Sequence, residues 1–292
     1  MLNRLLPPLR LSALPRTVGR RCGLAVCGIG SLLLFSGCAQ QPPSQTSSIA
    51  LSGKRLRVIM RFADPVNRAY HYYFLINYFT NQGASLGGGD QNAPGPVPVL
   101  GPFPSYGNGF ATGSGGSAYG FTDFVKFEDN TYRLLHVVGD PTVSHFIDEG
   151  APFSAVLPYS SNGDPHILQF DIDLSQIVVD ANGASLDAAT TVSKALAIKW
   201  LQVNIVATDI VPRGQSAVVS KQVDSLGNTL TQAGASSFLI LDVSQFRTFT
   251  NQDAVGSAAF EPNADNDIYT SNGAAGELSL NLVDYSISVV KQ

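Results

Sequence analysis

The stretch RLRVIMRF, residues 55–62, alternates apolar and polar side chains with a period of two. The apolar residues Leu56, Val58, Met60 and Phe62 occupy the even-numbered positions. Arginines occupy the odd-numbered positions 55, 57 and 61, so each parity corresponds to one face of a strand. Because successive side chains of a strand point to opposite faces of a sheet, this pattern predicts a β-strand with one buried and one solvated face.

Similar patterning extends through the chain from Lys54 to Gln292, and turn residues separate the segments. We expect further strands at 69–79, 121–127, 132–138, 153–157, 166–174, 198–208, 217–223, 238–243 and 278–289. Only Ala188–Ala195 suggests a helix, a short one with Asp187 as its N-cap. The pattern predicts an all-β fold, a mostly antiparallel β-sandwich of about ten strands.

Two local patterns fix the pairing of residues. Asp129-Asn130 lies between alternating runs and indicates a type I′ hairpin turn. Phe127 would then face Tyr132, and Asp123 would face His136. In the last strand the apolar parity changes after Leu282, so we expect a β-bulge near Leu282-Val283.

The stretch from Gly83 to Gly120 contains 12 glycines and 5 prolines in 38 residues and shows no strand pattern. Long loops inside compact domains are usually functional or disordered. This one also carries aromatic residues, which pure linkers lack. We therefore expect it to be partly ordered and to lie against the sheet.

The strand Ala69–Phe79 is apolar or aromatic on both faces, so its second face must be covered or used. One interpretation is an aromatic platform for a sugar or a peptide. The alternative is that the glycine- and proline-rich loop buries this face. Over about 20 residues the arrangement is similar to exported carbohydrate-binding β-sandwich modules. The candidate binding residues are His71, Tyr73, Phe79, Phe103, Tyr106 and Phe110.

Acidic residues suggest a hydrolase as the alternative function. Asp171 and Asp173 share one face of the segment LQFDIDLS, and glycosidases use two carboxyl groups. The opposite parity is apolar, so we expect both aspartates on a solvated face. Asp123, placed opposite His136, offers an acid–base pair. The sequence contains no G-x-S-x-G motif, and a catalytic thiol is excluded after residue 38.

The segment EPNADNDIY places Asn263, Asp265 and Asp267 at the alternate spacing of a calcium loop. Ile268 stands where such a loop needs glycine, so a surface turn rich in Asn and Asp is the alternative. The four histidines are too scattered to indicate zinc. The glycine spacing of residues 107–113 does not match a dinucleotide-binding loop. We therefore expect no cofactor.

The first 38 residues have the layout of an export signal. Five arginines precede an uncharged run from Cys22 to Gly37 that is interrupted by glycine and serine. A spanning helix would need about 20 predominantly apolar residues. The pair Arg20-Arg21 also suggests a twin-arginine signal, although the residues after it fit that pattern poorly.

Phe35-Ser36-Gly37-Cys38 resembles the lipobox of bacterial lipoprotein precursors. The resemblance implies cleavage before Cys38, diacylglycerol on its thiol, and anchoring in a membrane of the cell envelope. Ala39 after the cysteine implies passage to the outer membrane in a Gram-negative host. All three cysteines lie within residues 1–38, so the mature chain would keep one thiol, and lipidation would consume it.

We thus expect a signal peptide at 1–37, a flexible tether at 38–53 and a β-sandwich domain at 54–292. Loss of five arginines leaves 13 basic and 22 acidic side chains, a formal net charge of −9. This charge argues against nucleic acid as a partner. The sequence predicts a membrane-anchored, non-catalytic module that binds a glycan, a peptide or an envelope partner, or a purely structural envelope component.

Overall fold

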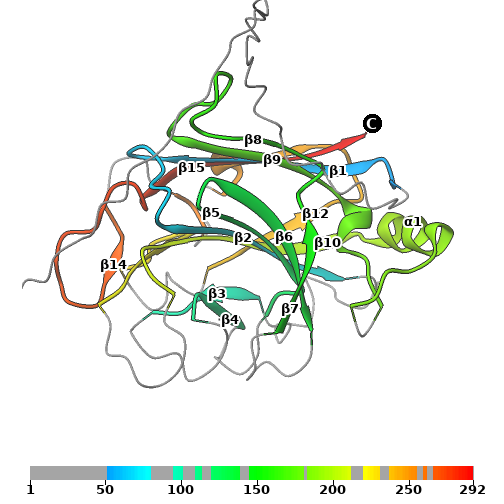
Figure 1. The fold of residues 1–292 in the computed structure, drawn as a ribbon, viewed down its shortest axis with the longest axis horizontal. Coiled ribbons are helices and arrows are strands. Elements are labelled where there is room, and N and C mark those ends of the chain that lie inside the picture. The colour runs from blue at the N-terminus through cyan, green and yellow to red at the C-terminus, as the bar shows by residue number, and fades with distance from the viewer. Residues whose placement is uncertain are drawn as a thin grey trace, which may run out of the picture. The chain divides into compact units, whose positions relative to one another are not determined.

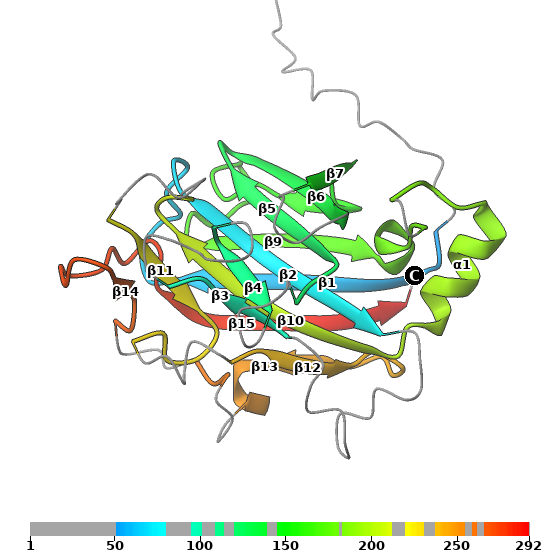
Figure 2. The ribbon, with the colours of Figure 1, turned by 90° about the horizontal axis from the view of Figure 1, so that it is seen from below.

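Two antiparallel β-sheets packed face to face make up the body of the protein (Figures 1 and 2). This computed structural model describes residues 51–79, 95–100, 109–113, 120–138, 145–180, 183–211, 220–230, 237–254, 259–261 and 266–291. All of them belong to one unit, residues 44–292. The expected all-β sandwich is confirmed.

The smaller sheet has five strands in the order β13-β15-β1-β9-β8. Their bounds are Thr248–Thr250, Leu282–Lys291, Lys54–Phe62, Ile167–Asp173 and Ser154–Val156. The alternating stretch 55–62 is therefore the central strand, paired with β15 on one side and β9 on the other. Its apolar parity is buried, as expected.

The larger sheet runs β14-β11-β10-β2-β5-β6-β7, and β12 also pairs with β10. The strands are Tyr269–Thr270, Gln222–Ser225, Trp200–Thr208, His71–Phe79, Asp123–Glu128, Thr131–Val138, His145–Gly150 and, for β12, Leu239–Asp242. β12 occupies the first half of the β10 edge and β11 the second half.

The main hydrophobic core fills the space between the two sheets, with side chains such as Val58 and Phe170 from one sheet and Phe74 and Val125 from the other. A second core lies on the outer face of the larger sheet. It is covered by a small hairpin of β3 (Pro96–Pro98) and β4 (Ala111–Gly113). The glycine- and proline-rich stretch therefore holds two short strands that the pattern did not predict.

The predicted local features are confirmed. Asp129 and Asn130 have φ angles of 48° and 59°, and Phe127 pairs with Tyr132 as a type I′ turn requires. Arg61 pairs with Asp284 but Phe62 with Leu282, so Val283 is the bulged residue.

Helices are few and short. α1 spans Ala188–Ala197, and the side chain of its N-cap Asp187 accepts a hydrogen bond from the Thr190 amide. Among the described residues, the 3-10 helices η1 (Leu174–Ile177) and η3 (Asn251–Ala254) extend the ends of strands. Within the described residues, no helix has the length and apolar character to cross a membrane.

Candidate functional site

The aromatic platform expected on the outer face of β2 is not open to solvent. Tyr73 is 2% exposed and Phe110 is 3% exposed. The two rings stack on each other, with centroids 3.9 Å apart and planes inclined by 3°. Phe124 and Phe121 surround this pair within the second core. The platform prediction is wrong for Tyr73 and Phe110, because the loop buries this face.

The other platform candidates lie apart from that stack. The Nδ1 atom of His71 is 2.6 Å from Oε2 of Glu128, whose other oxygen accepts a hydrogen bond from Lys126. Phe79 ends β2, and its backbone pairs with Trp200. Phe103 and Tyr106 fall outside the described residues.

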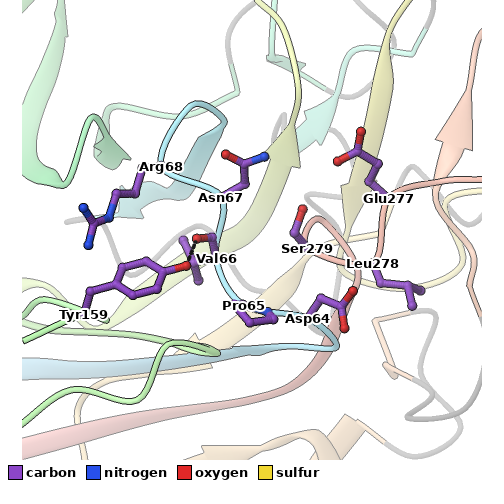
Figure 3. A pocket seen from close by; sticks show the side chains of 9 residues that line it. All are labelled: Asp64, Pro65, Val66, Asn67, Arg68, Tyr159, Glu277, Leu278 and Ser279. Carbon is purple, nitrogen blue, oxygen red and sulfur yellow. Dashed lines mark hydrogen bonds between the residues drawn. The ribbon is translucent and has the colours of Figure 1, made fainter.

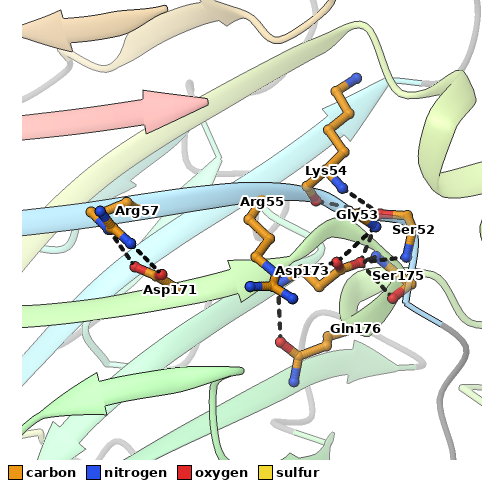
Figure 4. Close-up of polar contacts among 9 residues, drawn as sticks. All are labelled: Ser52, Gly53, Lys54, Arg55, Arg57, Asp171, Asp173, Ser175 and Gln176. Atoms are coloured by element: carbon orange, nitrogen blue, oxygen red, sulfur yellow. Dashed lines mark hydrogen bonds and ion pairs between the residues drawn. The ribbon is translucent and has the colours of Figure 1, made fainter. Parts of the chain in front are cut away.

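Asp171 and Asp173 are buried, contrary to the expectation of a solvated face (Figure 4). Asp171 accepts two hydrogen bonds of 3.0 Å from Arg57, the neighbouring residue on β1. The carboxylate of Asp173 accepts from the backbone amides of Ser52, Gly53 and Ser175 and from both serine hydroxyls. The arginines and the segment before β1 cover the polar parity of β9.

The hydrogen bonds to Asp173 decide its charge. Burial alone would raise its pKa, but the bonds from Ser175 and Ser52 outweigh burial and hold the pKa below its usual value. A carboxylate held by five donors fixes the start of β1. Asp171 and Asp173 therefore serve as structural anchors for this sheet.

Asp123 and His136 do meet, as the hairpin register predicts. Oδ1 of Asp123 lies 2.7 Å from Nδ1 of His136, and both side chains are buried. Burial raises the pKa of Asp123 despite this bond. Burial would lower the pKa of His136, but the hydrogen bond and charge of Asp123 raise it. The pair can hold one proton between its two partners.

Three buried carboxylates form an acidic cluster that sequence patterns located only in part. Side-chain oxygens of Asp224, Glu261 and Asp267 lie within 4.8 Å of one another. Burial, with the charge of Asp267, raises the pKa of Asp224 well above its usual value. Oxygen ligands of this kind suit a hard divalent cation. Of the predicted calcium residues, only Asp267 belongs to this set, and Asn263 and Asp265 lie outside the described residues.

An open pocket of about 660 Å³ lies at the end of β1 (Figure 3). Three segments that are distant in sequence line it: the turn after β1, the turn after β8 and the segment before β15. The lining residues are Asp64, Pro65, Val66, Asn67, Arg68, Tyr159, Glu277, Leu278 and Ser279. No sequence pattern pointed to this pocket, because its walls are irregular turns.

Hydrogen bonds fix the walls of the pocket relative to each other. The hydroxyl of Tyr72 donates to the Ser279 carbonyl at 3.0 Å and accepts from the Asn67 amide at 2.9 Å. The hydroxyl of Tyr159 donates to the Val66 carbonyl. The Asp64 amide donates to the Leu278 carbonyl at 3.2 Å. These bonds join all three segments, so the pocket is largely preformed.

Charged groups of both signs face this pocket. The guanidinium of Arg68 lies over the Tyr159 ring, 4.3 Å from its centroid. Glu277 accepts a 2.6 Å hydrogen bond from the Tyr70 hydroxyl. Burial and this carboxylate raise the pKa of Tyr70 to about 12, so the phenol remains a donor at neutral pH. In Figure 3 Arg68 and Tyr159 stand on one side of the pocket, and Glu277 and Asp64 on the other.

Comparison with known proteins gives no relative: no family model, no curated protein and no solved structure matches this chain.

Proposed function

We propose that the protein is a lipid-anchored component of the cell envelope whose β-sandwich binds a partner molecule without catalysis. The lipid would be carried by Cys38, on the lipobox resemblance of residues 35–38. The pocket between Arg68 and Glu277 is the proposed binding site. The observation that carries the proposal is this preformed, charged pocket at the end of β1 opposite the tether.

The tether leaves the domain at a defined point. Asp173 binds Ser52 and Gly53, the residues just before β1, through three hydrogen bonds and so fixes where the chain from Cys38 enters the sandwich. The anchored end of β1 is therefore rigidly defined.

The pocket begins two residues after the other end of that strand, at Asp64. β1 has nine residues, which at about 3.3 Å per residue separate the two ends by roughly 30 Å. A domain held at one end of β1 by its tether would present the pocket on the side away from the attachment point. This arrangement suits capture of a partner in the space beyond the membrane surface.

Several observations favour binding over hydrolysis. The carboxylates suggested as a glycosidase pair are engaged, Asp171 with Arg57 and Asp173 with the start of β1. The preformed pocket has charged walls but lies outside that pair. Charged and aromatic side chains in a preformed pocket are typical of a site that recognises a ligand by its polar groups.

Binding can be tested with the mature lipoprotein purified in detergent and applied to glycan and peptide arrays. We expect a ligand whose binding falls at least about tenfold in Arg68→Gln, since one charge-assisted hydrogen bond contributes that much. Arg247→Gln is the matched control, because Arg247 also stacks on an aromatic ring, Phe249. Equal binding by both variants to every ligand would exclude the pocket as the site.

A further inference from the structure

The charge pattern of the pocket identifies the chemistry of its ligand. Resting on the proposed function, we infer that the pocket binds a short zwitterionic peptide, with its carboxylate at Arg68 and its ammonium group at Glu277 and Asp64. A peptide with free ends carries one anionic group for Arg68 and one cationic group for the carboxylates, which is why the signs of the charges favour this class.

Arg68 lacks the acidic partner that most of the described arginines have. Arg55, Arg57, Arg61 and Arg133 each lie within 4.0 Å of an aspartate oxygen, whereas Arg68 and Arg247 have no such partner among the described residues. The Tyr159 ring supports the guanidinium plane of Arg68 and leaves its N–H donors available. A guanidinium held in this way is suited to bidentate binding of a carboxylate.

The opposite side offers acceptors for an ammonium group. Glu277 uses Oε2 for the Tyr70 hydroxyl, and its Oε1 atom has no hydrogen-bond partner within the described part of the chain. The Gln222 side chain accepts from the Glu277 amide at 2.8 Å and positions this residue. The Asp64 carboxylate likewise makes no hydrogen bond or ion pair with a described residue. Two carboxylates near one site attract a cation and disfavour an anion.

A neutral glycan fits these features less well. Sugars bind by stacking on an exposed aromatic face, and here the Arg68 guanidinium covers one face of Tyr159. Burying three charges beside a neutral ligand would cost desolvation without compensation. A zwitterion would offer an opposite charge to each side of the pocket at once.

The test is calorimetric titration of the mature lipoprotein in detergent with alanyl-alanine and with its analogue acetylated at the amine and amidated at the carboxylate. A neutral disaccharide serves as the third probe. We expect the free dipeptide to bind at least about tenfold more tightly than the blocked one, since two charge-assisted contacts are lost. Tri-alanine, titrated in parallel, tests the length of peptide that spans the pocket.

Variants assign each end of the ligand. Arg68→Gln should weaken the free dipeptide at least about tenfold. Measured with dipeptides blocked at one end only, Arg68→Gln should remove the preference for a free carboxylate, and Glu277→Gln the preference for a free amine. Arg247→Gln should change nothing, and unchanged thermal unfolding of each variant shows that the fold is retained.

Each other outcome overturns the inference. Equal binding of free and blocked dipeptides would exclude this ligand class. Absence of binding by any zwitterion at 10 mM, a concentration about a hundred times a common metabolite dissociation constant, would also exclude it. If the disaccharide binds and Arg68→Gln weakens it, the ligand class is wrong but the pocket remains the binding site. The proposed function fails separately, when no array ligand distinguishes Arg68→Gln from Arg247→Gln.

Discussion

Lys221 illustrates at the residue scale how the fold changes the chemistry of a side chain. Its side chain is fully buried in the second core, and Nζ donates to the carbonyls of Val99 at 2.7 Å and Gly109 at 2.6 Å. Burial lowers the pKa of Lys221 to about 7, against the opposing charge of Asp209. This amine therefore fastens the residues that follow β3 and precede β4 to the larger sheet.

The pH dependence of stability should reveal this lysine. The folded state releases its proton near pH 7, whereas the unfolded chain holds it up to pH 10.5. The contribution to stability is thus complete above pH 10.5 and is lost as the pH falls toward 7. Relative to Lys221→Met, the free energy of unfolding of the wild type should rise by about 4 kcal/mol between pH 7 and 10.

Urea unfolding of both proteins at several pH values measures this difference. Lys221→Met has no titrating group at this position, so changes elsewhere in the protein cancel in the comparison. A difference that stays constant from pH 7 to 10 would show that the amine has a normal pKa in the folded protein.

Residue identity alone did not reveal which polar side chains are buried. Asp171 and Asp173 alternate with apolar residues, a pattern that predicts an exposed strand face for both aspartates. The residues next to Lys221 give no indication that its side chain is buried. Their burial depends on Arg57, on Ser52 and on the segments at Val99 and Gly109, which are far away in the sequence. Local patterns cannot show such contacts.

At the scale of elements, the β3–β4 hairpin is the cover of the second core. Phe110, just before β4, contacts Tyr73, Phe121, Phe124 and Phe146. We expect Phe110→Ala to lower the free energy of unfolding by about 3 kcal/mol, the usual cost of removing a buried phenylalanine side chain. Urea denaturation measures this change.

Phe246→Ala is the matched control, because Phe246 is 56% exposed. Its substitution should change the free energy of unfolding by less than about 0.5 kcal/mol. Equal losses for the two variants would mean that the hairpin does not seal the second core.

Features with a clear local pattern followed from the sequence, and strands that were very short or lacked alternation did not. The hairpin at Asp129-Asn130 and the bulge at Val283 depend on neighbouring residues and on side-chain parity. β4 has three residues and β14 has two, too few for alternation to appear. β7 was also missed, since its segment HFIDEG mixes polar and apolar residues. Short strands form because a neighbouring strand offers hydrogen-bond partners.

At the scale of the whole molecule, the proposed lipid anchor at Cys38 would decide where the proposed binding pocket acts. We expect Cys38→Ser to abolish metabolic labelling with a fatty acid and to move the protein from the membrane fraction to the soluble fraction. Cys22→Ser and Cys27→Ser serve as controls, because both cysteines would leave with the signal peptide. Unchanged labelling of Cys38→Ser would disprove lipid attachment at this residue.

The sequence by itself determined the fold class, the central strand β1, the 129–130 hairpin and the bulge, because each depends on side-chain parity or on a two-residue turn. Only the tertiary structure decided the sites. The aromatic face of β2 became a core because the β3–β4 hairpin packs on it. The pocket exists because Tyr72 joins two of its three segments and Tyr159 joins the third to them. Contacts between distant segments create such sites, and no local pattern encodes them.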